Sequence, residues 1–436
     1  MISTPRVSLQ RVPNEKAHRI PDVTKASRPV PNAVGPATPS GPPLRHARPE
    51  RRHPLLSRLG LAALALVLGL VGAGALAYRH MQGNVQRHDI TSLLGGDRPG
   101  GAAAAPIDPK AGQALTFLVL GSDSRAGGNN DNSGITGMRA DTTMLVHVAA
   151  DRSRLEVVSI PRDTLVDIPS CTLPGGRQTR AETGAMINSA FSIGGQTGDV
   201  GAAAACSIRT VEKLTGVRVD DFVVVDFAGF TRVVDALGGV PMDVPQPIDD
   251  KRADVKLAAG CQVLNGHDAL GFARVRKSLG DGSDISRIGR QQELVAAIAR
   301  EALGKNLLTD LPSLYRFLDA TTKTLVTGPE IGQLSTMAGL ANSLRRIAPE
   351  NIVFTTMPFE WAGPRVRPAP AAGEVWDALR ADKPVPGTVT AGGTAPATAA
   401  PGGGAGASAT PAAPKAAGPS ESARGLQGTP APVCRK

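Results

Sequence analysis

The chain has 436 residues and a formal net charge of +10 at pH 7, and its length allows two or three domains at most. The basic excess is concentrated at one end, because residues 1–58 hold 11 Lys or Arg against 3 Asp or Glu. A nucleic-acid-binding protein usually carries its excess on a folded domain, so no nucleic-acid partner is expected. The four cysteines form no CxxC pair and the seven histidines no HExxH motif, which argues against a zinc enzyme.

A long uncharged segment near the N-terminus predicts a transmembrane helix. Residues 59–78 are twenty consecutive uncharged residues, and a helix of about that length spans about 30 Å, one bilayer core. The preceding basic arm, residues 1–58, is expected to be disordered and cytoplasmic, near anionic membrane lipids, with the rest of the chain outside the cell. The alternative is a cleaved signal peptide, but its leading segment would be far too long.

Composition divides the exterior part into a folded centre and two flanks. Residues 79–114 are typical of a linker, and residues 386–436 form an Ala/Pro/Gly-rich tail with almost no large apolar side chain, so neither is expected to fold. The centre, residues 115–385, is expected to be one domain. Strand and helix patterns alternate up to about residue 300, as in an α/β fold, and a helical extension follows, with a late strand at 352–357 that returns to the sheet.

Three apolar runs in the first part of this domain predict strands, the last two joined as a hairpin. If the first strand runs parallel to the third, the end of the first, the start of the second and the end of the third meet at one sheet edge. Loops at strand ends are where α/β proteins commonly build sites. The strands are expected at Thr116–Leu120, Thr142–Val148 and Leu155–Ile160, and the segments at the shared edge are 121–125, 139–141 and 161–163.

Later segments add a set of cations. A short helix leads to Arg274 and Arg276, and the following helix carries Arg287 and Gln291, which are four residues apart and therefore share a face. Guanidinium groups suit a bidentate grip on phosphate oxygens. The pattern predicts a cationic clamp.

Carboxylates and arginines without a His or Cys candidate indicate a hard divalent cation with oxygen ligands and a phosphate-bearing substrate. No phosphate-binding or dinucleotide glycine motif follows a strand, so a nucleotide substrate has no support. The alternative is that Asp123, Asp141 and the arginines form structural ion pairs at the loop bases.

These residues stand in ordered blocks that resemble the LytR-CpsA-Psr family of cell-envelope glycopolymer ligases. The blocks are FLVLGSDSR, RADTTMLVHV, VVSIPRDTLVDIP, MINSAFSIGG, DFVVVDFAGFTRVVDALGGV and LNGHDALGFARVRKSLGDGSDISRIGRQQ. The resemblance implies a three-layer α/β/α domain with a mixed central sheet and a hydrophobic groove for a polyprenyl chain. It also implies transfer of a glycopolymer from a polyprenyl pyrophosphate to a peptidoglycan hydroxyl, which forms a phosphodiester and releases polyprenyl phosphate.

The resemblance also implies roles for single residues. Asp123 and Asp141 are the expected carboxylates for Mg²⁺ or Mn²⁺, and Asp163 is expected to orient Arg162 rather than to take the proton of the attacking hydroxyl. Arg276 is expected to be required for transfer. The pyrophosphate would be held by Arg162, Arg274, Arg276, Arg287 and Gln291, with Arg125 as an additional contact.

Some of these positions have a structural role as the alternative to a role in binding. Phe227 and Phe230 either line the lipid groove or fill the core, and Asn188 more often pins a loop than touches a substrate. His267 stands where the family often has Glu and is expected on the surface at a helix start. A Gly/Asn-rich insertion, residues 126–138, is long enough for a flexible lid over the groove mouth.

The cysteines predict a disulfide, which an exterior location permits. Cys171 and Cys206 are separated by 34 residues, and closing that loop would stabilise the fold by roughly 3–4 kcal/mol in the chain-entropy picture. We predict this pair, with Cys261 as the competing partner. Cys434, in the tail, is expected to be unpaired or bonded to another molecule.

The same residues are also compatible with two alternative functions. One is a non-catalytic envelope regulator that binds lipid pyrophosphates and acts through its cytoplasmic arm, which lacks a helix-turn-helix pattern. The other is a polyprenyl-pyrophosphoryl hydrolase. The sequence does not choose among teichoic acid, arabinogalactan and capsule as the polymer.

Overall fold

A computed structural model describes residues 54–100, 112–123, 138–275, 284–304, 310–386, 389–390 and 434. The chain divides into two units, residues 1–64 and residues 65–436. Of the first unit, the described part is the beginning of helix α1 (Pro54–Asn84).

Helix α1 is longer than the predicted transmembrane segment. Its stretch Arg58–Asn84 has 27 residues and a mean hydropathy of 2.4, so by length and composition it can cross a membrane. The large apolar side chains between Leu59 and Tyr78, such as Leu61 and Leu70, are exposed.

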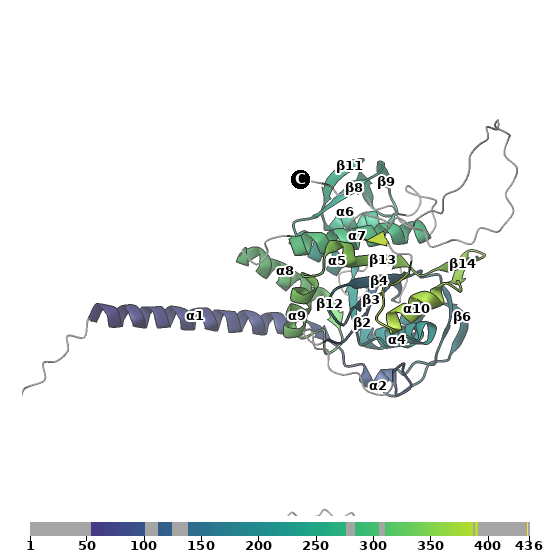
Figure 1. Ribbon diagram of the computed structural model, residues 1–436, viewed down its shortest axis with the longest axis horizontal. Helices are drawn as coiled ribbons and strands as arrows, with labels where there is room; N and C mark the ends of the chain where they lie inside the picture. The colour runs from purple at the N-terminus through teal and green to yellow at the C-terminus, as the bar shows by residue number, and fades with distance from the viewer. Residues whose placement is uncertain are drawn as a thin grey trace, which may run out of the picture. The chain divides into compact units, whose positions relative to one another are not determined.

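The second unit contains a mixed sheet of eight strands in the order β1-β12-β7-β2-β3-β4-β13-β16 (Figure 1). Strand β2 is antiparallel to β3 and β3 is antiparallel to β4, so β2 and β4 run in the same direction, as predicted. The late strand β13 pairs with β4 in parallel, which confirms its expected return to the sheet. The strands are β1 (Gln86–Arg87), β2 (Leu115–Ser122), β3 (Ala140–Val148), β4 (Leu155–Ile160), β7 (Asp221–Asp226), β12 (Leu325–Thr327), β13 (Ile352–Thr356) and β16 (Val389–Thr390).

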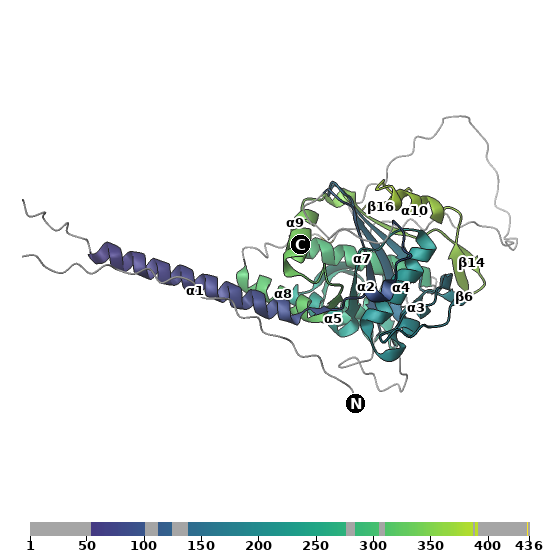
Figure 2. The same cartoon turned by 90° about the horizontal axis from the view of Figure 1, so that it is seen from below.

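Helices cover both faces of the sheet (Figures 1 and 2). Alternation along β2 explains this, because successive side chains of a strand point to opposite faces. Leu118 and Leu120 join the core under α4 and α10, whereas Val119 packs in a cluster with Val295 of α7. One face carries α2 (Thr91–Leu94), α3 (Asn188–Gly194), α4 (Val200–Thr215) and α10 (Ala372–Arg380), and the other carries α7 (Asp284–Gly304) and α9 (Leu334–Leu344).

The local sequence sets the limits of α4, the helix at the centre of the first face. The side chain of Asp199 caps it by accepting a hydrogen bond from the backbone N–H of Ala202 at 2.8 Å. Gly216 ends it with a φ of 65°, a conformation that glycine adopts without strain. Its run of buried alanines lets the helix lie close to its neighbours.

The remaining elements form ribbons and helices around this three-layer core. A second hydrophobic core lies between the hairpins near residues 240–264 and helices α5, α6 and α7. The elements are β5 (Leu165–Ile168), β6 (Glu182–Met186), β8 (Val240–Val244), β9 (Ile248–Asp250), β10 (Val255–Leu257), β11 (Gly260–Leu264), β14 (Phe359–Ala362), β15 (Arg365–Pro368), α5 (Phe227–Ala236), α6 (Gly266–Arg274), α8 (Leu311–Thr324), and the 3₁₀ turns Gly195–Thr197 and Pro349–Asn351.

The first part of the predicted linker, residues 79–114, is folded. Helix α1 continues to Asn84 and β1 then pairs with β12 in parallel. The Nε2 of Gln82 donates to the backbone oxygen of Gly332 at 3.1 Å. The expectation that this stretch does not fold is wrong because it contains a few apolar residues that pack against the domain. These residues, Met81, Val85, Ile90 and Leu94, are all buried.

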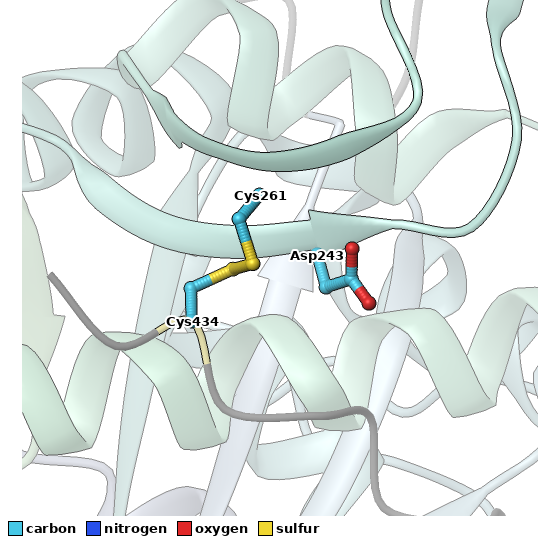
Figure 3. A group of neighbouring side chains, drawn as sticks. All are labelled: Asp243, Cys261 and Cys434. Carbon is cyan, nitrogen blue, oxygen red and sulfur yellow. A yellow bond between two sulfur atoms is a disulfide. The ribbon is translucent and has the colours of Figure 1, made fainter.

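The structure contains two disulfides. Cys171 and Cys206 are joined with an S–S distance of 2.01 Å, the pairing predicted from the sequence, and this bond ties a surface loop to α4. Cys261 of β11 is joined to Cys434 (Figure 3). The expectation that Cys434 is unpaired or intermolecular is therefore wrong. The number of residues between two cysteines predicts the entropy of closing the loop between them. It does not predict where in the fold a distant segment such as the tail makes contact.

The tail, residues 386–436, falls mostly outside the described residues. Within the described part, β16 extends the sheet by pairing with β13, and Cys434 holds the disulfide. The expectation that no part of residues 386–436 is folded is therefore wrong at these two places.

Replacing both Cys171 and Cys206 by alanine should lower the free energy of unfolding by roughly 3–4 kcal/mol, because the unfolded chain regains the freedom of the opened loop. Urea denaturation of the full-length protein in detergent micelles measures this change. Unchanged stability of the double variant would contradict the assigned role of the bond.

Asp221, at the start of β7, is a buried carboxyl whose charge the fold tolerates poorly. Its two oxygens accept hydrogen bonds from the backbone N–H groups of Ile331 at 2.6 Å and Phe222 at 2.8 Å. Burial nevertheless raises the pKa of Asp221 from 3.8 to about 6. The folded state therefore binds this proton more tightly than the unfolded state, and the stability gained from it is lost as the pH rises through about 6.

We expect the protein to gain stability as the pH falls from 7 to 5, and Asp221→Asn to reduce that gain by about 1 kcal/mol. Urea denaturation of both proteins at the two pH values measures it. The absolute stability of the variant is not the test, because an amide donor facing a backbone N–H is itself unfavourable. An identical pH dependence in variant and wild type would contradict the assignment.

Candidate functional site

The three predicted strand ends meet at one edge of the sheet. Ser122 at the end of β2 pairs with Ala140 at the start of β3, and Ile160 at the end of β4 pairs with Thr143. Just beyond β2, Asp123 exchanges two hydrogen bonds with Arg139: its backbone N–H donates to the Arg139 oxygen at 3.0 Å, and its Oδ1 accepts from the Arg139 N–H at 2.7 Å.

An irregularity in the ladder sets Asp141 apart from its neighbours. Gly121 pairs with Thr142 and Ser122 pairs with Ala140, so Asp141 is the extra residue of a bulge. Bulges change the direction of a side chain and are common beside active sites. Asp141 is thereby freed from the alternation of β3.

Arg162 lies between two carboxylates. Its Nη1 donates to Oδ1 of Asp141 at 2.8 Å, and its Nε lies 3.5 Å from Oδ1 of Asp163. All three side chains are partly exposed, with 16% of Arg162, 28% of Asp141 and 26% of Asp163 accessible. One guanidinium thus faces two carboxylates at a position that an anionic ligand can reach.

The backbone around Arg162 is held from both sides. The hydroxyl of Thr164 donates to the backbone oxygen of Pro161 at 2.6 Å and closes a tight turn. The N–H of Asn188, the first residue of α3, donates to the backbone oxygen of Arg162 at 3.3 Å. Asn188 is buried, and this bond comes from its backbone, so the role of its side chain stays a prediction.

Helix α7 brings its predicted pair to the same edge. The hydroxyl of Thr142 donates to Oε1 of Gln291 at 3.2 Å, which puts Gln291 next to the residue that follows Asp141. Arg287 lies one turn earlier on the same face of the helix and is buried. The structure therefore brings Gln291 to the edge that carries Asp141 and Arg162, with Arg287 one turn earlier on α7.

A neighbouring glutamine, which the sequence did not single out, fixes α7 on the sheet. The Nε2 of Gln292 lies within hydrogen-bonding distance of Oγ of Ser159 at 2.9 Å, the backbone oxygen of Thr355 at 3.0 Å and Oγ1 of Thr356 at 3.3 Å. These acceptors lie at the ends of β4 and β13. The contact determines where on the sheet Gln291 stands.

Arg274 and Phe227 lie together beside this edge. The guanidinium carbon of Arg274 is 5.0 Å from the centre of the Phe227 ring, a cation–π contact. Arg274 is exposed, Phe227 is partly buried, and Phe230 packs against the second core. Of the two roles expected for Phe230, the structure therefore shows packing in the core.

Asp226 is a carboxylate at the site that the sequence analysis did not assign. It ends β7, lies opposite Ser122 in the parallel ladder, and caps α5 by accepting a hydrogen bond from the N–H of Gly229 at 2.6 Å. The available signal was an Asp between an apolar run and a helix. A parallel pairing of β2 with β7 was needed to place it beside Asp123.

Other predicted positions are away from the site or cannot be placed. Arg125, Arg276 and nearly all of the insertion 126–138 lie outside the described residues. His267 is exposed at the start of α6 and bonded to Asp254, which agrees with a surface role. A cavity of about 360 Å³ lies between α2, the loop 172–176 and the start of α4, and none of the predicted site residues lines it.

The donor set at the edge suits a hard cation. Asp123 and Asp141 offer carboxylate oxygens from neighbouring strand ends, and Mg²⁺ commonly completes such a pair with water and substrate oxygens. Within the described ranges, three potential ligands from His, Cys, Asp or Glu gather only at Asp243, Cys261 and Cys434. There the two sulfurs are bonded to each other (Figure 3), so that group has one carboxylate and no thiolate to offer.

Known proteins resemble this chain in sequence over most of the described domain. The LytR_cpsA_psr family matches residues 78–375. The cell wall biosynthesis protein LcpA of Corynebacterium glutamicum is 30% identical over 357 residues, which cover 77% of this chain and 65% of LcpA. The regulatory protein MsrR of Staphylococcus aureus is 28% identical over 228 residues, 52% of this chain and 61% of MsrR. The chain thus spans slightly less than two thirds of these relatives.

A solved structure supports the fold. The protein gbs0355 of Streptococcus agalactiae superimposes with a TM-score of 0.50 at 19% sequence identity, over 64% of this chain and 91% of that one. At this identity the likeness concerns the fold alone.

Replacing Gln292 by leucine should lower the free energy of unfolding by about 1–3 kcal/mol, because partly buried acceptors on β4 and β13 lose their donor. Thr142→Val removes a single contact of Gln291 and should cost less than about 1 kcal/mol. Urea denaturation compares the two. The matched control is Gln196→Leu, an exposed glutamine bonded to the backbone oxygen of Ile193. A loss in the control as large as in Gln292→Leu would remove the role assigned to Gln292.

Proposed function

The chain belongs to the LytR-CpsA-Psr family, and from this premise we propose that it is a membrane-anchored phosphotransferase acting in cell wall biosynthesis. It would transfer a glycopolymer from a polyprenyl pyrophosphate to peptidoglycan through a phosphodiester bond. The supporting observation is the edge where Arg162 lies between Asp141 and Asp163, with Arg287 and Gln291 alongside.

The arginines would bind the pyrophosphate. Arg162 is bonded to Asp141 and partly exposed, so a phosphate oxygen can share its guanidinium without unfolding the loop. The buried Arg287 would act from the helix side, and its burial strengthens its attraction for an anion. The complete set in this proposal is Arg162, Arg274, Arg276, Arg287 and Gln291, with Arg125 as an additional contact.

Asp123 and Asp141 would hold Mg²⁺ or Mn²⁺. When bound, such an ion neutralises charge on the phosphate oxygens. Arg162 then keeps Asp163 as a partner, so its guanidinium stays oriented if Asp141 turns to a cation. This supports the orienting role of Asp163 over a role as proton acceptor.

The reaction balances as a transfer of one phosphoryl-linked glycan. The oxygen of a peptidoglycan hydroxyl forms a bond to the phosphorus attached to the glycopolymer, and the P–O bond of the pyrophosphate bridge breaks. Polyprenyl phosphate leaves with the bridging oxygen, and the hydroxyl proton passes to solvent or to a nearby base. The chain's part is to orient the two groups and stabilise charge at the phosphorus.

The lipid and the membrane complete the proposal. Phe227, which is not absorbed into the second core, is the better candidate for the lining of a polyprenyl groove, and α1 would anchor the chain. A cytoplasmic N-terminus and an exterior domain are supported by the two disulfides, which persist in oxidising compartments. The polymer remains teichoic acid, arabinogalactan or capsule in this proposal.

A second candidate function is a non-catalytic regulator that binds lipid pyrophosphates. It is favoured by the similarity to MsrR, which is called a regulatory protein. The two candidates differ in turnover rather than in the site. Hydrolysis, with water replacing the glycan hydroxyl, is a third outcome of the same experiment.

The test incubates the full-length protein in detergent micelles with a polyprenyl-pyrophosphoryl oligosaccharide and a soluble peptidoglycan fragment, with and without Mg²⁺. Mass spectrometry follows the products. Metal-dependent release of polyprenyl phosphate together with a phosphodiester-linked glycan supports the transferase. Binding without turnover supports the regulator, and release without a linked product supports hydrolysis.

Arg162→Ala should reduce the transfer rate by about 10²–10³-fold, the usual effect of removing one donor to developing charge. Arg345→Ala is the matched control, because this exposed arginine makes a side-chain contact only one turn away, with Asn342. Retained transfer in Arg162→Ala would refute the site.

Asp141→Asn should lower both the transfer rate and its dependence on Mg²⁺, because the amide is a poorer metal ligand than the carboxylate. Asp151→Asn, in the β3–β4 turn at the opposite edge of the sheet, is its control. Transfer assays over a range of Mg²⁺ concentrations measure both. An unchanged Mg²⁺ dependence in Asp141→Asn would remove Asp141 from the metal site.

A further inference from the structure

The β14–β15 hairpin displays a tryptophan on the surface. Outside α1, the described residues include three large hydrophobic side chains that are exposed, namely Val263, Tyr315 and Trp361. Trp361 has 54% of its surface accessible, whereas Trp376, the other tryptophan of the chain, is 4% accessible. Tryptophan, with an apolar ring and a polar N–H, is enriched where proteins contact other molecules, so this indole is a candidate contact.

The hairpin is attached to the turn that carries Arg162. The N–H of Val366 in β15 donates to the backbone oxygen of Asp163 at 3.4 Å, and Val366 forms an isolated parallel bridge with Thr164. Trp361 pairs directly with Val366 across the hairpin. Two strand spacings therefore separate the backbone of Trp361 from that of the Asp163–Thr164 turn, about 10 Å.

A second connection comes from the central sheet. The N–H of Met357, the residue after β13, donates to the backbone oxygen of Ser159 near the end of β4 at 2.9 Å. Strand β14 begins two residues later, and Figures 1 and 2 show it near β6. The hairpin is thus joined to the site edge through β15 and through the segment that leads into β14.

The orientation of the indole is fixed in advance. Its ring packs edge-on against Phe359, with centres 5.6 Å apart and planes at 86°, and Phe359 is buried. Val366, opposite Trp361 and on the same face of the hairpin, is also buried. Gly363 turns the hairpin with a φ of 67°. A ring held this way loses little freedom when a ligand packs on it.

The surroundings favour a sugar over a protein or a lipid surface. On the face of the hairpin that carries the indole, the apolar neighbours Phe359 and Val366 are buried, so the exposed indole is not part of a continuous apolar patch. The other face carries exposed charged side chains, Glu360, Arg365 and Arg367. A protein interface or a membrane-docking surface needs a continuous apolar patch. A single aromatic face with a polar N–H at its rim matches one face of a pyranose ring, whose C–H groups are apolar and whose edge is hydroxylated.

We propose that Trp361 forms the floor of a subsite for the sugar backbone of the acceptor glycan, on the hairpin next to the Arg162 turn. That this glycan is the acceptor rests on the proposed function, whereas the binding of a glycan at Trp361 rests on the geometry of the hairpin. The occupant is a strand of wall glycan that lies on Trp361 and extends one of its hydroxyls toward the phosphate site. Trp361 is then a positioning residue, since it does not touch the reacting atoms.

The direct test is binding of a peptide-free tetrasaccharide of alternating N-acetylglucosamine and N-acetylmuramic acid to the full-length protein in micelles. Calorimetry should show Trp361→Ala to bind at least 10-fold more weakly, with Trp361→Phe between it and the wild type. The sugar should also protect the tryptophan fluorescence of the wild type from acrylamide, since the second tryptophan is buried. The control Tyr315→Ala removes the exposed aromatic of α8, 43% accessible, and should bind as the wild type.

Transfer kinetics separate the subsite from the reaction. Trp361→Ala should raise KM for the glycan about 10-fold and leave kcat unchanged, which loss of a merely structural side chain would not do. Equal tetrasaccharide binding by wild type and Trp361→Ala, or no binding to the wild type, overturns the subsite. Weaker binding of Trp361→Ala to vesicles of anionic lipid, with unchanged sugar binding, also overturns it in favour of a membrane contact. Sugar binding that depends on Trp361 in a protein without transfer activity leaves the subsite standing and refutes the proposed function instead.

Discussion

The antiparallel pairing of β3 with both β2 and β4 is the constraint on which the site depends. Because β3 runs opposite to its neighbours, its first residues stand beside the last residues of both, and side chains distant in sequence meet at one edge. The bulge at Gly121 and Ser122 then releases Asp141 from the pleat. Helix α7 reaches the same edge because Gln292 binds the ends of β4 and β13. The strands and the helix are held by buried apolar clusters on both faces of the sheet.

Charge at this edge is distributed unevenly. Arg162 is shared by two carboxylates, whereas Arg274 lies on an aromatic ring, so the cations are held in place by different means. A shared guanidinium can exchange one partner for a phosphate oxygen while the other continues to orient it. The loop that carries it is fixed by backbone hydrogen bonds from Asn188 and Val366. The atoms that hold the turn are therefore different from the side-chain atoms that it presents at the edge.

Much of this arrangement was predictable because it follows from strand patterns. The apolar runs gave β2, β3 and β4 to within two residues, and their direction brought Asp123, Asp141 and Arg162 together. The later pair Arg287 and Gln291 followed from helical spacing. What failed depended on contacts between distant segments. The docking of residues 79–100 rests on a few scattered apolar side chains, the return of Cys434 to Cys261 left no trace in the composition of the tail, and Asp226 required the parallel pairing of β2 with β7. The exposure of Trp361 likewise follows from the hairpin register and not from its neighbours in sequence.

The Cys261–Cys434 bond has a consequence for proteolysis of the chain. It closes a covalent ring over a sequence separation of 173 residues, which includes α7, β13 and the Trp361 hairpin. A protease that cuts once within this ring opens it but releases no fragment, because both sides of the cut stay linked through sulfur. A nicked molecule therefore keeps its intact mass on a non-reducing gel and separates into two pieces only after reduction.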